Sequence, residues 1–300
     1  MSSLISGLTV LSSVGVDLHK RLLKSVGLTK SLLKSSDAPS IRPYEIFRPN
    51  PRWSRLESSD LKILGVPGFR NIAEHIVHFE IPSDILQTFH AHNSVQFPSS
   101  KEESMRMDEI FNAETLPLIN TFVGNAVAFF PDDYKAVIAK SRLGEESTVY
   151  DKRYASYMGL HVDNWCEPKI DLMRRNKSAV RIFVNLGTEA RDLNFINLTL
   201  AQILEIMQSH EKIEAFRSAN NPIQLCHAFM ENFPEYPVVQ LEVYPGEGCV
   251  VPVCNIIHDG YTLYKSEPDV NLTLTSQGFC LRESFLASFI SKDTLSSCCL

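Results

Sequence analysis

The sequence predicts a mostly β protein with flanking helices, and three observations support this fold class. Residues 179–186 form a continuous run of apolar and β-branched side chains that ends at Gly187, which is the clearest strand pattern in the chain. Residues 242–257 contain two apolar runs separated by a Pro-Gly turn, the pattern of two successive strands. Helical periodicity is concentrated in the first half of the chain and at about residues 199–232. We therefore expect a β core at about residues 147–280 with helices around it.

The bulk composition is that of an ordinary globular chain and argues against some classes of function. The 300 residues are 44% hydrophobic and 21% charged, enough apolar material for one large domain. The formal net charge of −6 argues against a general nucleic-acid-binding protein, which would carry a basic stripe. No stretch reaches the roughly 18 consecutive apolar residues of a membrane span. The 7 cysteines are odd in number and lack a Cys-x-x-Cys pair, which favours reduced thiols and a cytoplasmic protein.

The first 52 residues are predicted to form an N-terminal helix and a proline-rich connection, ahead of a single domain at residues 53–300. Leu11, Leu18 and Leu22 recur at helical spacing in a stretch rich in serine, leucine and lysine. A helix packed on the main domain and an organellar transit peptide share this composition, so both interpretations stay open. Prolines between residues 39 and 51 then preclude regular helix.

The remaining elements follow in order along the chain. Helices are predicted at residues 82–89 and 102–122, whereas three segments fit either a strand or a helix: 72–79, 124–130 and 134–140. Strands of the β core are predicted at residues 148–150, 154–161, 179–186, 195–198, 238–244, 249–257 and 270–275. Helices stand where a plain barrel would have a hairpin, so we expect a helical insertion at about residues 199–232, made of segments 200–208, 211–219 and 222–231.

The stretch that says most about chemistry is His161-Val162-Asp163, taken together with His258. Side chains alternate across a strand, so His161 and Asp163 would point to one face. His258 follows the apolar run 249–257 and would supply a second imidazole from another strand. Two imidazoles and one carboxylate on one side of a metal form the facial triad of non-haem Fe(II) oxygenases, which leaves positions open for substrates. The sequence therefore predicts a metal site at His161, Asp163 and His258.

The order of strand, Pro-Gly turn, apolar strand, His258 and Gly260, downstream of His161 and Asp163, resembles the Fe(II)/2-oxoglutarate-dependent oxygenases. The likeness is to their phytanoyl-hydroxylase-like, small-molecule branch and covers roughly residues 150–280. It implies a double-stranded β-helix (jelly-roll, cupin-like) core in a single oxygenase domain, with Fe(II) and 2-oxoglutarate as cofactors. The implied reaction is hydroxylation, desaturation or oxidative cyclisation of a small molecule, for example an amino-acid-derived or other natural-product intermediate.

The resemblance also implies an anchor for 2-oxoglutarate, and here the sequence departs from the family pattern. Members usually carry an Arg about a dozen residues after the second His, followed two residues later by Ser or Thr. In this chain Asn271 stands at the Arg position and Thr273 at the hydroxyl position, and Asn cannot form a charge-assisted pair with a carboxylate. Arg181 lies in the clearest strand, on the predicted face of Phe183 and Asn185, so we expect it to bind the cosubstrate instead. A solvent-facing position or a structural ion pair is the alternative for Arg181.

Further contacts are predicted around these residues. Tyr157 shares the strand face of the first metal ligand, so its hydroxyl would orient the cosubstrate or the substrate. Asn164, Trp165 and Asn185 are candidate substrate contacts, although Trp165 fits a core position at least as well. Asp259 is predicted to be a solvent-facing or turn residue and not a ligand.

Two other classes of function stay open at this point. A cupin-like binding protein would keep the barrel without the redox cycle, and the missing family Arg favours it. A metal enzyme on the same barrel would use Zn(II) or Mn(II) and no ketoacid. The expected partners are a small-molecule substrate and O2, with no nucleic acid and no membrane span, and the sequence leaves the oligomeric state open.

Overall fold

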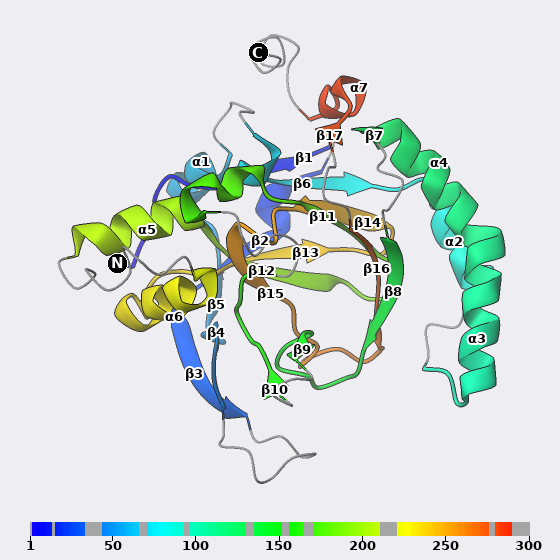
Figure 1. Cartoon of the computed structure of the whole chain (residues 1–300), viewed down its shortest axis with the longest axis horizontal. Coiled ribbons are helices and arrows are strands. Elements are labelled where there is room, and N and C mark those ends of the chain that lie inside the picture. The colour runs from blue at the N-terminus through cyan, green and yellow to red at the C-terminus, as the bar shows by residue number, and fades with distance from the viewer. Residues whose placement is uncertain are drawn as a thin grey trace.

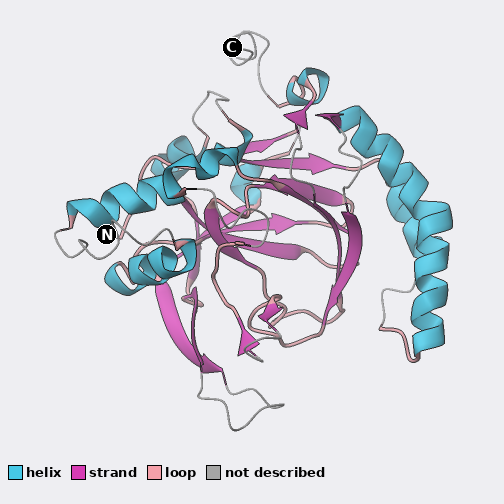
Figure 2. Ribbon diagram, in the orientation of Figure 1, coloured by secondary structure: helices cyan, strands magenta, loops and turns pink. Residues whose placement is uncertain are grey.

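Two β sheets face each other at the centre of the protein, and helices lie around them (Figures 1 and 2). The computed structural model describes residues 2–13, 16–33, 44–65, 71–92, 97–129, 135–151, 156–164, 171–210, 221–275 and 280–289. Within these ranges, none of the helices has both the length and the apolar character needed to cross a membrane.

The larger sheet has six strands and brings together segments that are far apart in the sequence. Its order is β1 (Thr9–Ser12), β6 (His75–Glu80), β14 (Glu247–Val251), β11 (Arg181–Asn185), β16 (Asp269–Thr275) and β8 (Lys135–Ser141). All neighbours are antiparallel except β1 and β6. Odd-numbered residues of β11 line a cavity between the sheets, whereas Ile182 and Val184 pack outward against helices, as the strand period of two requires.

The smaller sheet has five antiparallel strands. Its order is β15 (Ile256–Asp259), β12 (Arg191–Thr199), β13 (Val239–Val243), β2 (Leu22–Ser25) and β5 (Trp53–Arg55). Three two-stranded pairs are also described: β9 (Tyr150–Asp151) with β10 (Ser156–Tyr157), β7 (Val127–Phe129) with β17 (Cys280–Leu281), and β3 (Leu28–Leu33) with β4 (Tyr44–Pro49). The segments that fitted either strand or helix therefore contain the strands β6, β7 and β8.

The strand pairing is nested, like a long hairpin that has been rolled up. β12 pairs with β13, β11 pairs with β14, and β8 pairs with β16, each in antiparallel register. From β13 to β16, consecutive strands alternate between the smaller and the larger sheet. This arrangement is a double-stranded β-helix of the jelly-roll type, so the predicted fold class, mostly β with flanking helices, is confirmed.

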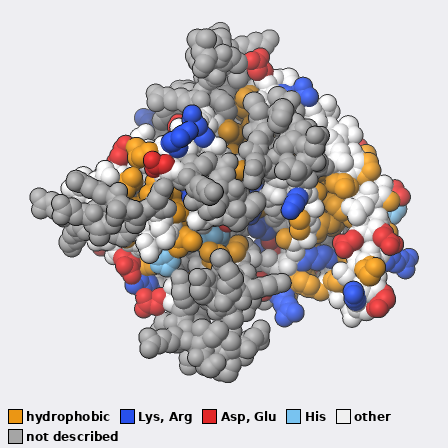
Figure 3. Space-filling view, in the orientation of Figure 1, with side chains coloured by type: hydrophobic (Ala, Val, Ile, Leu, Met, Phe, Trp, Pro, Cys, Tyr) orange, Lys and Arg blue, Asp and Glu red, His pale blue; other side chains and the backbone are white. Residues whose placement is uncertain are grey.

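Helices cover the outer face of the larger sheet. They are α2 (Ser83–His92), α3 (Lys101–Ile110), a π-helical segment at Phe111–Thr115 and α4 (Leu116–Ala126), seen on the right in Figure 1. Apolar side chains of α2 and α4, including Ile85 and Ile119, join Ile182 and Leu272 of the sheet in one buried cluster. α3 buries no residue, and acidic and basic side chains mix over it on the face shown in Figure 3.

A second group of helices lies between β12 and β13 in the chain. α5 (Leu200–Ser209) and α6 (Pro222–Asn232) confirm the helices predicted at residues 200–208 and 222–231, while segment 211–219 lies outside the described residues. The α5 helix begins with a capping box formed by Thr199 and Gln202. The short helices are α1 (Ser58–Leu64), α7 (Glu283–Leu286) and 3-10 turns at Leu18–Lys20, Ile72–Glu74 and Leu172–Lys177.

The predicted N-terminal helix is wrong, because this segment is incorporated into both sheets. β1 pairs in parallel with β6, and β2 lies between β13 and β5. The start of the segment is buried on both faces, with Leu8, Thr9 and Val10 at 0%, 8% and 2% exposed. The spacing of Leu11, Leu18 and Leu22 matches a helix only locally. The hydrogen-bonding partners on β6 and β13 decide the outcome, and they are remote in the sequence.

The single strand predicted at residues 249–257 is in fact two strands in opposite sheets. β14 ends at Val251 and β15 begins at Ile256. Pro252 has no N–H for a β ladder, and its carbonyl accepts a hydrogen bond from the backbone N–H of Asn255 at 2.8 Å. The resulting turn carries the chain into the smaller sheet, where it delivers His258.

A buried hydrogen-bond chain ties the N-terminal segment to the barrel. Tyr236 Oη donates to Asn197 Oδ1 at 2.7 Å, and Asn197 Nδ2 donates to the Ile5 carbonyl at 2.8 Å. We expect Tyr236→Phe to lower the free energy of unfolding by about 1–3 kcal/mol, because it leaves a buried oxygen of Asn197 unpaired. Denaturant unfolding curves measure this change. Tyr264→Phe is the control, since Tyr264 is 77% exposed. Equal stability of the Tyr236 variant and the control would contradict the expectation.

Candidate metal centre

The three predicted ligands come together in the structure. His161, Asp163 and His258 are buried, and one ligand atom of each lies within 4.8 Å of the others. The backbones of the two histidines pair directly, with His161 N donating to His258 O at 3.0 Å and His258 N donating to His161 O at 2.8 Å. Asp163 N donates to Val253 O at 3.0 Å. β15 and the turn before it therefore hold the motif, although His161 forms only an isolated β-bridge and not a full strand.

The hydrogen bonds of the two imidazoles leave one nitrogen of each ring for a metal. His161 Nδ1 lies 2.6 Å from the Gly159 carbonyl oxygen, and His258 Nδ1 lies 3.3 Å from the Ile256 carbonyl oxygen. A carbonyl only accepts, so each Nδ1 carries a proton and donates it, and the neutral form of each ring has its lone pair on Nε2. His161 Nε2 has no hydrogen-bond partner among the described residues, which fits a metal-binding atom.

Gly159 is required for this arrangement. Its φ of +64° lies in the left-handed region that favours glycine, and a Cβ atom at this position would stand 2.5 Å from the Phe47 carbonyl oxygen. The close approach is maintained by the hydrogen bond from Leu160 N to Phe47 O at 2.8 Å. The backbone turn thus aims the Gly159 carbonyl at the ring of His161.

The charges of the three groups suit a divalent cation. Burial lowers the pKa of His258 to about 3, so this imidazole is neutral at pH 7. Burial opposes ionisation of Asp163, but His161 and Arg181 outweigh it and hold the pKa of the carboxyl well below its usual range. Burial alone would lower the pKa of His161, yet Asp163 and Asp259 raise it. A proton on His161 and a metal ion therefore compete for the same site.

The two oxygens of Asp163 face different neighbours. Oδ1 lies 3.5 Å from His161 Nε2, and Oδ2 lies 2.8 Å from Arg181 Nη2. Ligand atoms next to each other on a six-coordinate ion with bonds of about 2.1 Å are roughly 3 Å apart, close to the first of these separations. The residues present therefore fit a divalent metal held by two imidazoles and one carboxylate, the donor set of non-haem Fe(II) centres.

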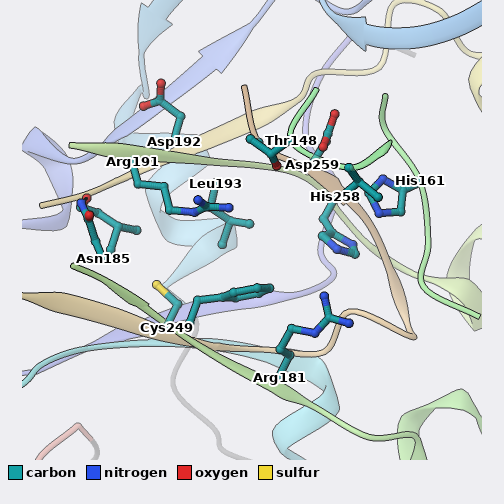
Figure 4. A pocket seen from close by; sticks show the side chains of 14 residues that line it. Thr148, His161, Arg181, Asn185, Arg191, Asp192, Leu193, Cys249, His258 and Asp259 are labelled. Atoms are coloured by element: carbon teal, nitrogen blue, oxygen red, sulfur yellow. Dashed lines mark hydrogen bonds between the residues drawn. The ribbon is translucent and has the colours of Figure 1, made fainter. Parts of the chain in front are cut away.

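A cavity that is partly open to solvent lies beside the two imidazoles (Figure 4). Arg181, Phe183 and Asn185 line it from β11, on the face that strand alternation predicts, and Leu193 and Val243 line it from the smaller sheet. The side-chain amide of Asn185 makes hydrogen bonds to three backbone groups. Asn185 therefore shapes the wall of the cavity while its polar atoms are already paired.

Arg191 is a second cation of this cavity, one that the sequence motifs did not single out. Its side chain extends into the cavity (Figure 4), is 16% exposed, and pairs with the carboxylate of Asp269. Lys265 Nζ lies 2.9 Å from the other oxygen of Asp269, so two cations share one carboxylate. Burial lowers the pKa of Arg191 to about 10, which leaves the guanidinium charged at pH 7. Arg191 and Leu193 are two residues apart on one strand and therefore point to the same face. This spacing is the sequence signal that could have placed Arg191 on the inner face.

The two residues at the anchor position of the family do not line the cavity. Asn271 and Thr273 lie on β16, opposite Asn185 and Phe183 of β11. Asn271 Nδ2 donates a hydrogen bond to Thr273 Oγ1 at 2.9 Å. The polar groups at this position thus bond to each other, and neither supplies a positive charge.

The other predicted contacts are engaged elsewhere. Tyr157 Oη donates to Glu145 Oε1 at 2.8 Å, and Tyr157 is not part of the cavity wall. Asn164 Oδ1 accepts a hydrogen bond from Arg175 Nη2 at 2.7 Å. Trp165 lies outside the described residues. Asn164 therefore connects the metal motif to a fully buried arginine, and a role for it toward substrate stays a prediction.

The prediction that Asp259 is solvent-facing is wrong, because β15 continues to this residue and a loop covers it. Asp259 is 6% exposed, and its side chain points away from that of His258 (Figure 4), as alternation requires. Thr148 N donates to Gly260 O at 2.8 Å, which fixes the covering loop. Burial raises the pKa of Asp259 to about 7.

Comparison with known proteins adds only distant structural likenesses. No protein-family model and no curated protein matches the sequence. The Kdo hydroxylase KdoO, a non-haem Fe(II) α-ketoglutarate-dependent dioxygenase solved with α-ketoglutarate and Fe(III), is similar with a TM-score of 0.36 at 12% identity, over 72% of this chain and 82% of that chain. Its cobalt(II) complex is similar with a TM-score of 0.37 at 14% identity, with the same coverage of both chains. Likenesses this weak establish no activity, so the fold assignment rests on the sheet order and register of this chain.

The raised pKa of Asp259 predicts a pH-dependent stability of the metal-free protein. The pKa is about 7 in the folded protein against an ordinary value of 3.8, so the folded state binds this proton more tightly than the unfolded chain. The stabilisation is complete below about pH 4 and is lost as the pH rises to about 7, with a slope of up to about 1.4 kcal/mol per pH unit. We expect Asp259→Asn to flatten this part of the curve of unfolding free energy against pH, measured with a chelator present.

A matched control for this measurement is Glu109→Gln, an exposed carboxyl on α3. This variant should keep the pH dependence of the wild-type protein. An unchanged slope between pH 4 and 7 in Asp259→Asn would contradict the assigned role of Asp259.

Proposed function

We propose that the protein is a non-haem Fe(II)- and 2-oxoglutarate-dependent oxygenase that oxidises a small molecule. The observation that carries the proposal is the buried set of His161, Asp163 and His258, with Nε2 of each imidazole available for a metal, beside a cavity that contains a cation. Two imidazoles and one carboxylate with open positions are the donor set of Fe(II) oxygenases, whereas closed four-ligand sets mark structural zinc.

The protein contributes binding and orientation to this chemistry. Bound Fe(II) supplies the coupling of 2-oxoglutarate decarboxylation by O2 to oxidation of the substrate. The carbonyls of Gly159 and Ile256 orient the two imidazoles so that Nε2 of each faces the metal position, because each carbonyl accepts a hydrogen bond from Nδ1. Burial of all three ligands keeps water away from the reacting groups.

Arg191 is the best-placed anchor for the far carboxylate of 2-oxoglutarate. The anchor must lie away from the metal, because the other end of the cosubstrate binds there. Phe195 stands opposite His258 in the sheet, and Arg191 is four residues before it, about 13 Å along the strand. An Arg side chain and an extended five-carbon diacid together span a distance of that order. Arg181, in contrast, contacts the metal ligand Asp163.

The proposal also covers the kind of substrate, the reaction and the location of the protein in the cell. The cavity is partly open to solvent and has both apolar and polar lining residues, as small-molecule sites do. Membership of the phytanoyl-hydroxylase-like branch, with a natural-product intermediate as substrate, is supported by the motif order at residues 242–260. Hydroxylation, desaturation and oxidative cyclisation are all compatible with this site. A cytoplasmic location is supported by the odd number of cysteines and the absence of a Cys-x-x-Cys pair.

A second candidate function is a cupin-like binding protein or a metal enzyme without a ketoacid. The observation in its favour is that Arg191 already pairs with Asp269, while Asn271 occupies the family's anchor position. A dicarboxylate would then have to share Arg191 with Asp269. Lys265 makes this sharing feasible, because it also neutralises Asp269.

Anaerobic titration tests the proposed function directly. Metal-free protein is loaded with Fe(II), 2-oxoglutarate is added, and the visible spectrum is recorded. We expect a weak iron-to-ketoacid charge-transfer band that saturates with 2-oxoglutarate. His161→Ala should lose both the band and stoichiometric iron, and His92→Ala, an exposed histidine on α2, should behave like the wild-type protein. Iron binding without the band would favour a different metal enzyme, and no iron binding would favour the binding protein.

Replacing Arg191 tests the cosubstrate anchor. We expect Arg191→Gln to raise the Kd of 2-oxoglutarate by about 10-fold or more, because a charge-assisted hydrogen bond to the carboxylate is lost. Iron affinity should not change, and Lys265 should keep Asp269 paired so that the variant folds. Calorimetry with Fe(II)-loaded protein measures both constants, with the exposed Arg55→Gln as control. An unchanged Kd for 2-oxoglutarate would move the anchor elsewhere.

A further inference from the structure

We propose that Arg181 is a positioning residue that holds Asp163 so that only one carboxylate oxygen faces the metal. This inference rests on the proposed metal centre and assigns Arg181 a task other than binding the cosubstrate. It follows from the ion pair between Arg181 Nη2 and Asp163 Oδ2 at 2.8 Å. The remaining oxygen, Oδ1, is the one that lies 3.5 Å from His161 Nε2.

The two partners are fixed by different elements, a strand and a turn. Arg181 begins β11 in the larger sheet and stands opposite Val251 of β14. Asp163 is held by its backbone N–H on Val253 O, in the turn that leads from β14 to the smaller sheet. The ion pair therefore spans the gap between the two sheets where β14 ends. A contact anchored by backbone on both sides can set the direction of a side chain.

The surroundings of Arg181 restrict its guanidinium. Its Cζ lies 5.6 Å from the ring centroid of Phe183, close enough for a cation–π contact. The side chains of Arg181 and Asp163 are 16% and 9% exposed, so solvent screens the pair only weakly. A planar guanidinium held in this way can present its N–H groups to a carboxylate in one orientation.

The consequence concerns the number of open metal positions. A carboxylate can bind a cation through one oxygen or through both. Binding through both oxygens of Asp163 would occupy one of the metal positions that O2 and a bidentate ketoacid require. An arginine on Oδ2 opposes that second bond, and it also prevents rotation of Oδ1 away from the two imidazoles. Arg181 would therefore support metal affinity and keep the coordination sphere open.

This role and a cosubstrate role for Arg181 make opposite predictions for two binding constants. The variants are Arg181→Gln and Arg181→Lys, and the measurements are anaerobic calorimetry of Co(II) binding and of 2-oxoglutarate binding at saturating metal. We expect Arg181→Gln to weaken metal binding by roughly 10–100-fold, as loss of a partner of a metal ligand commonly does. Arg181→Lys should restore part of that loss. The affinity for 2-oxoglutarate at saturating metal should stay near that of the wild-type protein.

The visible spectrum of the Co(II) form gives a readout that general loss of stability would not change. Its intensity depends on coordination number, so a change in the binding of Asp163 should alter the Arg181→Gln spectrum. Thermal unfolding of the metal-free variants checks that they are folded. Arg191→Gln is the matched control and should show the reverse pattern, with normal metal binding and weak 2-oxoglutarate binding.

The outcomes separate this inference from the proposed function. Unchanged metal affinity with weak 2-oxoglutarate binding in Arg181→Gln would overturn the inference and make Arg181 the cosubstrate anchor. If Arg181→Gln weakens metal binding and the wild-type protein shows no ketoacid band, the inference is supported while the oxygenase proposal fails. Equal metal affinity of His161→Ala and the wild-type protein would overturn both.

Discussion

The reciprocal backbone pairing of His161 and His258 is the constraint on which the site depends. Two hydrogen bonds of 3.0 and 2.8 Å join residues that are almost a hundred positions apart in the sequence and set their ring centroids 4.8 Å apart. Directly paired residues in a sheet point to the same face, so both imidazoles face the cavity. The Pro252 turn and β15 bring the second histidine to this place, and Gly159 allows the first to approach. The ligand set is thus a product of strand pairing.

The cavity contains two arginines, and the barrel gives each of them its own acidic partner, which offsets the repulsion between their charges. Arg181 and Arg191 lie at 5.6 and 6.0 Å from the ring centroid of Phe183 and have different acidic partners. Arg181 pairs with Asp163 and Arg191 pairs with Asp269. The positive charge of each buried arginine is therefore neutralised by a neighbouring carboxylate, as a low-dielectric interior requires. Their partners suggest different tasks, one next to Asp163 and one next to Asp269.

Local alternation predicted the inner face of β11 and placed His161 and Asp163 on one side, because this signal depends on neighbours in the sequence. The strand-turn-strand pattern singled out His258, and the fold brings the three side chains together. The helix predicted in the N-terminal segment is wrong because pairing with β6 and β13, which lie far along the chain, determines that this segment forms strands. The prediction that Asp259 is solvent-facing is wrong for a related reason, since the loop that buries it comes from residues 145–149. Arg191 carried no motif, and its significance depends on Asp269 and on the cavity. Long-range pairing is thus the information that the local pattern lacks.

The presence of Asn271, where the sequence resemblance predicts an arginine, is understandable from the charges around it. Asp269 and Asn271 are two residues apart on β16 and therefore point to the same face. Arg191 and Lys265 already share Asp269, so an arginine at position 271 would place a third cation next to one carboxylate. Asn271 pairs with Thr273 and adds no charge. A cation on β12 that pairs with Asp269 stands close to where an arginine of β16 would stand. Arg191 thus supplies, next to Asp269, a positive charge that Asn271 does not.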